Sequence, residues 1–296
     1  MNESLLLLAF MVPGTLFLGA YQVLVRKTLR SPFPEGLLLG IVFFLSGVFL
    51  LGASYLIGFP EIEKGFWSAF IITVFLNIIS QFIWIKAFKL EEASLISPLL
   101  LISPILVFLT GFAVLGEVPS LFGVFGVCIT VVGLWFLLEA ELTYQKMSLG
   151  ALIRKPGILY GLSGIALFAL AFPFDKKAVV FSSAILYSGF AIFLIGLFHL
   201  LWGSLVYRHS LATLTTLAWS LKRNIFFLLI CNAVGIVLAN HALNYSLVAY
   251  ASSVKRLSPL WAVLFAGVFL HETNIQKKLI ATLLMIVGVA LTALAG

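Results

Sequence analysis

The chain has 296 residues, of which 62% are hydrophobic and only 10% charged, and its mean hydropathy is +1.18. Soluble proteins contain roughly 45–50% apolar residues, so this composition excludes a soluble globular protein. The net charge of +7 does not lie on a basic soluble face, which excludes a nucleic-acid-binding protein. We attribute it to loops that orient the chain in a lipid bilayer, with an anionic ligand as a second explanation.

Ten apolar segments reach the length of about 20 residues that a helix needs to cross a bilayer. The sequence therefore predicts an all-α membrane protein with ten transmembrane helices, and the first segment is read as a span rather than a cleaved signal. Leucines at helical spacing between basic ends predict a short interfacial helix within 207–224. The predicted spans are approximately 5–28, 36–58, 66–87, 93–115, 119–138, 157–179, 182–206, 225–246, 249–270 and 276–295.

The two halves of the chain repeat one another. An offset of 155 residues aligns, without a gap, Asn77 with Asn232, Ser103-Pro104 with Ser258-Pro259, and Glu117 with Glu272. Each half holds five spans, and an odd number gives the halves opposite orientations. This predicts an inverted repeat, a transporter plan with the ligand site between the halves near the midplane. The predicted domains are a first five-helix repeat at 5–138, a cytoplasmic linker at 139–156 and a second five-helix repeat at 157–295.

The loop charges predict an orientation. Most lysines and arginines lie in loops after the odd-numbered spans, whereas the opposite loops hold only Lys64, Lys176 and Lys177. The positive-inside rule then puts both termini outside. We expect a multi-pass protein of the cytoplasmic (inner) membrane, as a monomer or homodimer.

Two adjacent cations, Lys255 and Arg256, lie inside the ninth span. Each costs roughly 2.5–3.5 kcal/mol at the centre of a membrane helix, so the pair needs compensation. Their counterparts in the first repeat are Leu100 and Leu101, so the cations are not part of the duplicated scaffold. At helical spacing they share a face with Ser252 and Pro259.

The chain's only aspartate, Asp175, precedes Lys176 and Lys177 at the end of the sixth span, on the same side of the membrane as the start of the ninth. One carboxylate cannot neutralise four cations. The pattern is consistent either with snorkelling plus a pair to Asp175 or with an anion site formed by the surplus charge. Asp175 is also the candidate for binding a coupling ion, because no other acid lies well inside the repeats.

Other polar and small residues have both a structural and a functional interpretation. Interhelical hydrogen bonds and a water-filled pathway both fit the polar stripes, which include Gln22, Asn77, Gln81, Trp84 and Asn240. Glu117 and Glu272 are predicted to cap the helix that follows each of them. Pro104 and Pro259 predict a bend at equivalent places, and Gly189, Gly196 and Gly203 predict close helix packing.

The sequence contains no Walker A motif, nucleophile elbow, HExxH motif or cluster of metal ligands. We therefore expect no enzyme activity, no cofactor and no metal site. Without an ATP-binding site, transport would run on a gradient or by exchange.

These features resemble the drug/metabolite transporter superfamily, specifically its EamA-type members with two tandem five-span repeats. The resemblance rests on the stretch from Ala93 through Ser103-Pro104 to Glu117 and on the stretch from Ser258-Pro259 through Glu272 to Gly288. It implies a ten-helix transporter with both termini in the cytoplasm, opposite to the loop charges, so both orientations stay open. Asp175-Lys176-Lys177-Ala178 and Val254-Lys255-Arg256 are similar to the cationic stretches with which plastid sugar-phosphate translocators hold phosphate. That similarity implies Lys177, Lys255 and Arg256 as anion ligands.

The sequence thus predicts a secondary transporter that moves a small organic metabolite, anionic or zwitterionic, by alternating access. An exporter of amino acids or amphipathic compounds, with Trp84, Trp261, Tyr21 and Gln22 lining an aromatic cavity, is the alternative, and ligand charge separates the two. A non-transporting membrane receptor or scaffold is a third possibility, without an extramembrane domain to support it. The predicted substrate-binding residues are Lys255, Arg256, Lys177, Gln22, Tyr21, Asn77, Gln81, Trp84, Asn240 and Ser252, with Asp175 for a coupling ion.

Overall fold

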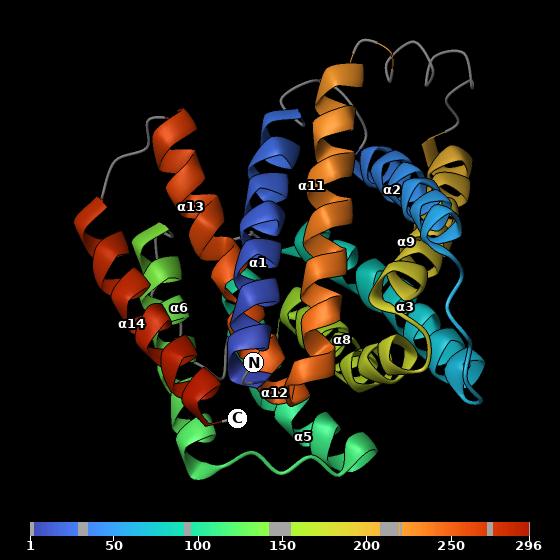
Figure 1. The fold of residues 1–296 in the computed structure, drawn as a ribbon. Helices are drawn as coiled ribbons and strands as arrows, with labels where there is room; N and C mark the ends of the chain where they lie inside the picture. The colour runs from blue at the N-terminus through green and yellow to red at the C-terminus, as the bar shows by residue number, and fades with distance from the viewer. Residues whose placement is uncertain are drawn as a thin grey trace.

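A computed structural model describes residues 3–28, 35–91, 96–141, 155–207, 219, 221–270 and 275–295 (Figure 1). The first half contains α1 (Glu3–Thr28), α2 (Glu35–Ile57), α3 (Phe66–Leu90), η1 (Ser97–Ile102), α5 (Ser103–Leu115) and α6 (Leu121–Glu141). The second half contains α8 (Pro156–Val180), α9 (Ala184–Tyr207), α11 (Lys222–His241), η2 (Ala242–Tyr245), α12 (Val248–Lys255), α13 (Leu257–Leu270) and α14 (Ile275–Leu294). The predicted linker and the predicted interfacial helix fall for the most part outside the described residues.

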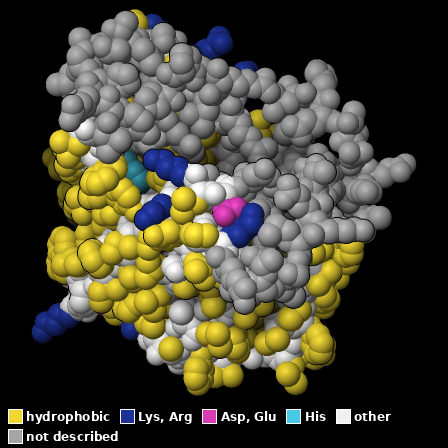
Figure 2. Space-filling view, turned by 180° about the vertical axis from the view of Figure 1, so that it is seen from behind, with side chains coloured by type: hydrophobic (Ala, Val, Ile, Leu, Met, Phe, Trp, Pro, Cys, Tyr) yellow, Lys and Arg dark blue, Asp and Glu magenta, His cyan; other side chains and the backbone are white. Residues whose placement is uncertain are grey.

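The outer surface of the helices is suited to contact with lipid. In the described part of the chain, 6 helical segments are by themselves long and apolar enough to cross a membrane, namely α1, α2, α3, α8, α9 and α11 with η2. The remaining predicted spans coincide with η1–α5, α6, α12–α13 and α14. Large apolar side chains point outward, with Leu56 85% and Leu205 73% exposed, and Figure 2 shows hydrophobic side chains over much of the described surface on one face. Such exposure would be costly in water and is favourable in lipid, which confirms the all-α membrane protein.

The main helix contacts join one half of the chain to the other and obey a two-fold relation. The pairing of α3 with α8 corresponds to that of α11 with α1, and the pairing of α5 with α8 corresponds to that of α13 with α1. The two-fold relation exchanges α2 with α9 and α6 with α14, so each of these two pairings joins equivalent helices of the two halves. These pairings are what two interlaced five-helix repeats of opposite orientation require. The described ends of the chain consequently lie on one side of the membrane, called here the termini side; the N and C marks lie close together in Figure 1.

Both Ser-Pro motifs lie where a span is interrupted. In the first half, η1 gives way to α5 at Ser103-Pro104, and in the second, α13 begins one residue before Ser258-Pro259. Proline has no N–H to continue the helical hydrogen bonds and clashes with the carbonyl four residues earlier. The helices break where the two prolines predict a bend, at equivalent places in the repeats.

Glycines bring α2 and α9 into backbone contact. A Cβ on Gly196 would lie 2.3 Å from the Phe44 backbone nitrogen, whereas a Cβ on Gly189 or Gly203 would first meet the side chain of Leu51 or Leu37, at 3.1 and 2.5 Å. The close packing predicted from these glycines is confirmed.

Gly196→Ala is therefore expected to lower the thermal stability of the purified protein, because the added methyl group meets backbone that cannot move aside. Overpacking of this kind costs about 1–3 kcal/mol. Gly52→Ala is the matched control, since nothing lies within 4 Å of a Cβ at that position. A melting curve in detergent should shift for Gly196→Ala and not fall for Gly52→Ala; equal shifts would contradict this packing.

Candidate functional site

The interruption of the ninth span places two cations at a helix end inside the bundle. Lys255 is the last residue of α12 and Arg256 caps it, so both lie at the carbonyl end of that helix, where cations are favoured. Pro259 has no N–H to donate to the carbonyl of Lys255, so the helical hydrogen bonds are interrupted there. Both residues keep an intermediate exposure although the preceding residues of α12 are buried, so the two cations are partly accessible.

Lys255 lies against one face of α8. Its ammonium is 5.2 Å from the ring centroid of Phe172 and 5.9 Å from that of Phe168. Asp175 follows on the same face of α8, three residues after Phe172, and its carboxylate attracts the ammonium electrostatically. Two aromatic faces and a carboxylate thus compensate part of the cost of this cation.

Arg256 connects the halves. Its Nη2 donates a hydrogen bond to Ser103 Oγ, the serine of the first Ser-Pro motif. Among the described residues, however, Arg256 Nε and the nearby Ser253 Oγ are buried atoms without a hydrogen-bond partner. A buried polar group left unpaired costs about 1–3 kcal/mol, so an additional hydrogen-bond acceptor beside the guanidinium would be stabilising.

Asp175 is held by hydroxyl groups from two other helices. Thr73 of α3 and Tyr187 of α9 both donate to Asp175 Oδ1. Asn77 donates to Thr73 Oγ1 at 3.1 Å and lies beside the same carboxylate. We call Thr73, Ser103, Asp175, Tyr187, Lys255 and Arg256 the charged cluster.

The charged cluster carries surplus positive charge. In the part of the chain that the structure describes, ion pairs within 4 Å join Lys155 to Glu91 and Lys176 to Glu117, so Asp175 attracts Lys255 only over a longer distance. With one carboxylate against two cations, the cluster has a formal charge of +1 when all three groups are ionised. The arrangement is suited to binding an oxyanion: Arg256 offers a fork of donors and Lys255 a point charge.

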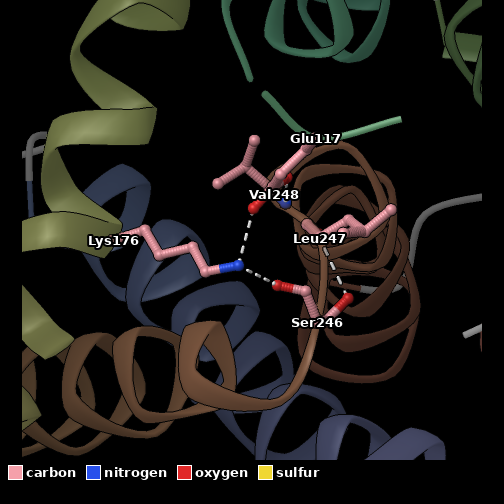
Figure 3. Close-up of polar contacts among 5 residues, drawn as sticks. All are labelled: Glu117, Lys176, Ser246, Leu247 and Val248. Carbon is pink, nitrogen blue, oxygen red and sulfur yellow. Dashed lines mark hydrogen bonds and ion pairs between the residues drawn. The ribbon is translucent and has the colours of Figure 1, made fainter. Parts of the chain in front are cut away.

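A second polar cluster ties the halves together on the termini side (Figure 3). Lys176 Nζ lies 2.6 Å from Glu117 Oε1 and 2.8 Å from the carbonyl oxygen of Ser246. Glu117 Oε2 also accepts a hydrogen bond from the backbone N–H of Val248, the first residue of α12, at 2.7 Å. We call these four residues the clasp, because they join the α5–α6 loop, α8 and the start of α12.

The clasp corrects the predicted role of Glu117. Glu117 caps α12 of the other half rather than the following helix α6. The capping position of α6 is already taken by Ser120, whose hydroxyl accepts the N–H of Gly123 at 3.2 Å. Glu272 lies outside the described residues.

Comparison with known sequences identifies the protein family. A sequence model of the EamA-like transporter family matches residues 5–139 and 155–294. The chain belongs to this family. Its members are membrane transporters of the drug/metabolite type, so the predicted resemblance is confirmed and the two matched ranges account for the repeat.

A solved structure described only as "Crystal structure of protein" is similar to this EamA-like transporter, with a TM-score of 0.76 and 16% sequence identity. The match covers 99% of this chain and 96% of that one. At this identity the likeness shows the fold alone. No curated protein matches the sequence.

The structure gathers some of the predicted site residues of this EamA-like transporter and separates others. Lys255, Arg256, Asp175 and Asn77 meet in or beside the charged cluster, as described above. Lys177 does not join them in this conformation, because its ammonium donates to the Val114 carbonyl at 3.1 Å, on another side of α8. Gln22 reaches Ser258 Oγ at 3.4 Å, next to the break in the ninth span.

The remaining predicted residues make structural contacts. Ser252 donates to the carbonyl of Ala249, Asn240 donates to Ser188 at 2.8 Å, and Gln81 pairs with His199 at 2.6 Å. The residues of the alternative aromatic cavity are divided among three hydrophobic clusters. Tyr21 packs against the cluster that contains Leu37 and Leu228, Trp84 against the cluster that contains Ile96 and Ile158, and Trp261 against the main core.

Two members of the charged cluster, Thr73 and Tyr187, are not among the residues predicted from the sequence. Thr73 lies one helical turn before Asn77, so the polar stripe on the third span could have been extended to it. Tyr187 had no such signal, because a single tyrosine in an apolar span is ordinary. Only the packing of α9 against α3 and α8 brings it to Asp175.

Proposed function

We propose that this EamA-like transporter carries a small organic anion or zwitterion across the cytoplasmic membrane by alternating access, with Lys255 and Arg256 as its main ligands. The observation that carries the proposal is that Arg256 Nε lacks an acceptor in a cluster with surplus positive charge whose two cations are partly exposed. A carboxylate or phosphate group would supply both the missing acceptor and the missing negative charge. Because Lys177 is turned elsewhere, the proposal rests on the other two cations.

The position of the charged cluster also suits a transporter. It lies where α12 ends and α5 begins, and Arg256 binds a serine of the opposite half. An anion bound there would contact both halves at once. Rocking of one inverted repeat against the other could then expose the same cluster to either side of the membrane.

A thermal-stability screen on the purified protein tests this proposal. We expect sulfate, phosphate, glycerol 3-phosphate and succinate to raise the melting temperature, and glycerol and tetraphenylphosphonium to leave it unchanged. A ligand at 100 times its Kd stabilises a folded protein by about 2.7 kcal/mol, which such a screen resolves. The double variant Lys255→Gln/Arg256→Gln should lose the response to anions.

Lys86→Gln is the control for that variant. Lys86 is also a lysine in a span, but its ammonium binds Tyr160 at 2.8 Å, away from the cluster. Its response to anions should match that of the wild type. Stabilisation by neutral or cationic compounds alone, or an undiminished response in the double variant, would refute the proposed ligands.

A further inference from the structure

We propose that Asp175 is a proton-binding site coupled to the anion site, so that a doubly charged anion is bound and carried together with one proton. This inference deepens the proposed function and rests on it. It concerns the energy source of transport, which the family does not determine.

Charge balance in the cluster favours this coupling. With Asp175, Lys255 and Arg256 all ionised, the formal charge is +1. A monoanion brings the total to zero without any further change. A dianion leaves it at −1, and an uncompensated charge away from water is costly. Uptake of one proton by the Asp175 carboxylate restores neutrality.

Lys255 links the two sites physically. Its ammonium is attracted by Asp175 and rests on the rings of Phe168 and Phe172, with no ion pair within 4 Å among the described residues. The flexible stem of a lysine lets the ammonium turn from the carboxylate toward an arriving anion without movement of the backbone. When the ammonium turns, Asp175 loses its counter-charge as a second negative group comes close, and both changes favour its protonation.

The immediate partners of Asp175 tolerate either protonation state. Thr73 and Tyr187 are hydroxyl groups, which donate to a carboxylate and can accept from a carboxylic acid. No rearrangement of α3 or α9 is needed when the proton arrives. A lysine or arginine in either place would have fixed Asp175 in its ionised form.

Several other ionisable groups on the packed elements are engaged elsewhere. Lys86 of α3 binds Tyr160 at 2.8 Å, and Glu91, which follows α3, pairs with Lys155. On α8 itself, Lys176 pairs with Glu117 and Lys177 donates to Val114. On α9, His199 pairs with Gln81, and on α11, His241 contacts Tyr245 of η2 at 3.2 Å. Lys255 of α12 and Tyr187 of α9 are the ionisable groups that face Asp175 in the described structure, with Arg256 beside Lys255, and Asp175 is the carboxylate among them.

Sulfate is the probe for the test, because it remains a dianion throughout the neutral pH range and does not titrate itself. Isothermal titration calorimetry of the full-length protein in detergent, repeated across that range, gives its affinity at each pH. Binding that takes up one proton is favoured by acid, so the affinity should rise by up to about tenfold for each unit that the pH falls. Buffers with different ionisation enthalpies should report uptake of up to one proton per sulfate bound.

Asp175→Asn should abolish this pH dependence while still binding sulfate, because the amide stays neutral at every pH. Glu61→Gln, which removes an exposed carboxylate between α2 and α3, should behave as the wild type. A pH-independent affinity in the wild type, or a pH dependence that persists in Asp175→Asn, would overturn the coupling and leave the anion site standing. If Asp175→Asn does not fold, wild-type calorimetry decides alone, since the absence of proton uptake overturns the inference. Failure of sulfate and every other anion to bind would overturn the proposed function and this inference together.

Discussion

Arg256→Met is expected to weaken anion binding by at least about 100-fold, the largest loss for any single residue of the charged cluster. Arg256 offers several donors in one plane, and hydrogen bonds to a charged group contribute about 1.5–3 kcal/mol each. The substitution removes that fork and also the bond to Ser103 that joins the halves. The affinity for phosphate, measured by calorimetry on the purified protein, checks the prediction.

Arg256→Lys separates charge from geometry. It keeps the positive charge at the end of α12 but replaces the planar fork by a single ammonium. We expect an affinity between those of the wild type and of Arg256→Met. If Arg256→Lys binds phosphate as well as the wild type, charge alone suffices; if Arg256→Met also binds normally, Arg256 is not a ligand.

Glu117→Ala is expected to open the termini side and to destabilise the protein. One carboxylate there compensates the ammonium of Lys176 and caps α12, so its loss leaves a cation and a backbone N–H unpaired. Breaking a buried ion pair costs about 3–5 kcal/mol. Because the side chains of Lys176 and Glu117 keep 19% and 10% exposure, we expect a smaller effect, on the order of 2 kcal/mol.

Cysteine labelling measures the opening. Ser246→Cys places a thiol in the clasp, to which Ser246 contributes only its backbone carbonyl, and a membrane-impermeant maleimide should label it faster when Glu117→Ala is added. Glu91→Ala is the matched control, because the ion pair of Glu91 with Lys155, at 2.9 Å, joins α3 to α8 at the opposite side of the membrane. Equal labelling rates with and without Glu117→Ala would show that the clasp does not hold the termini side closed.

Lys176→Met helps to distinguish the two roles of Glu117. It removes the ion pair while leaving the carboxylate free to cap α12. We expect part of the loss in melting temperature seen with Glu117→Ala. A loss as large as that of Glu117→Ala would assign the whole effect to the ion pair.

Much of the fold could be predicted because its signals are patterns of the sequence itself. Runs of apolar residues marked the spans, and the offset that aligns Ser103-Pro104 with Ser258-Pro259 revealed the repeat and both interruptions. The asymmetry at Lys255 was visible for the same reason. Its counterpart Leu100 packs in an apolar cluster, whereas Lys255 lies in a charged one.

The partners of these residues could not be predicted, because they come from distant segments and depend on helix rotation. Lys176 and Lys177 are neighbours in sequence, yet one binds Glu117 and the other Val114, since successive helical residues point about 100° apart. Glu117 was expected to cap the next helix and instead binds Val248, 131 residues away. Only the interlaced packing of the two repeats decides such contacts.

A structure determined in the presence of selenate tests the central claim most directly, because selenium scatters anomalously and marks the anion. We predict one ordered selenate within hydrogen-bond distance of Arg256 and Lys255, close to Ser103, and none in the same place in Lys255→Gln/Arg256→Gln. Selenate ordered only elsewhere, in a protein that it stabilises, would contradict the assignment of this cluster as the anion-binding site.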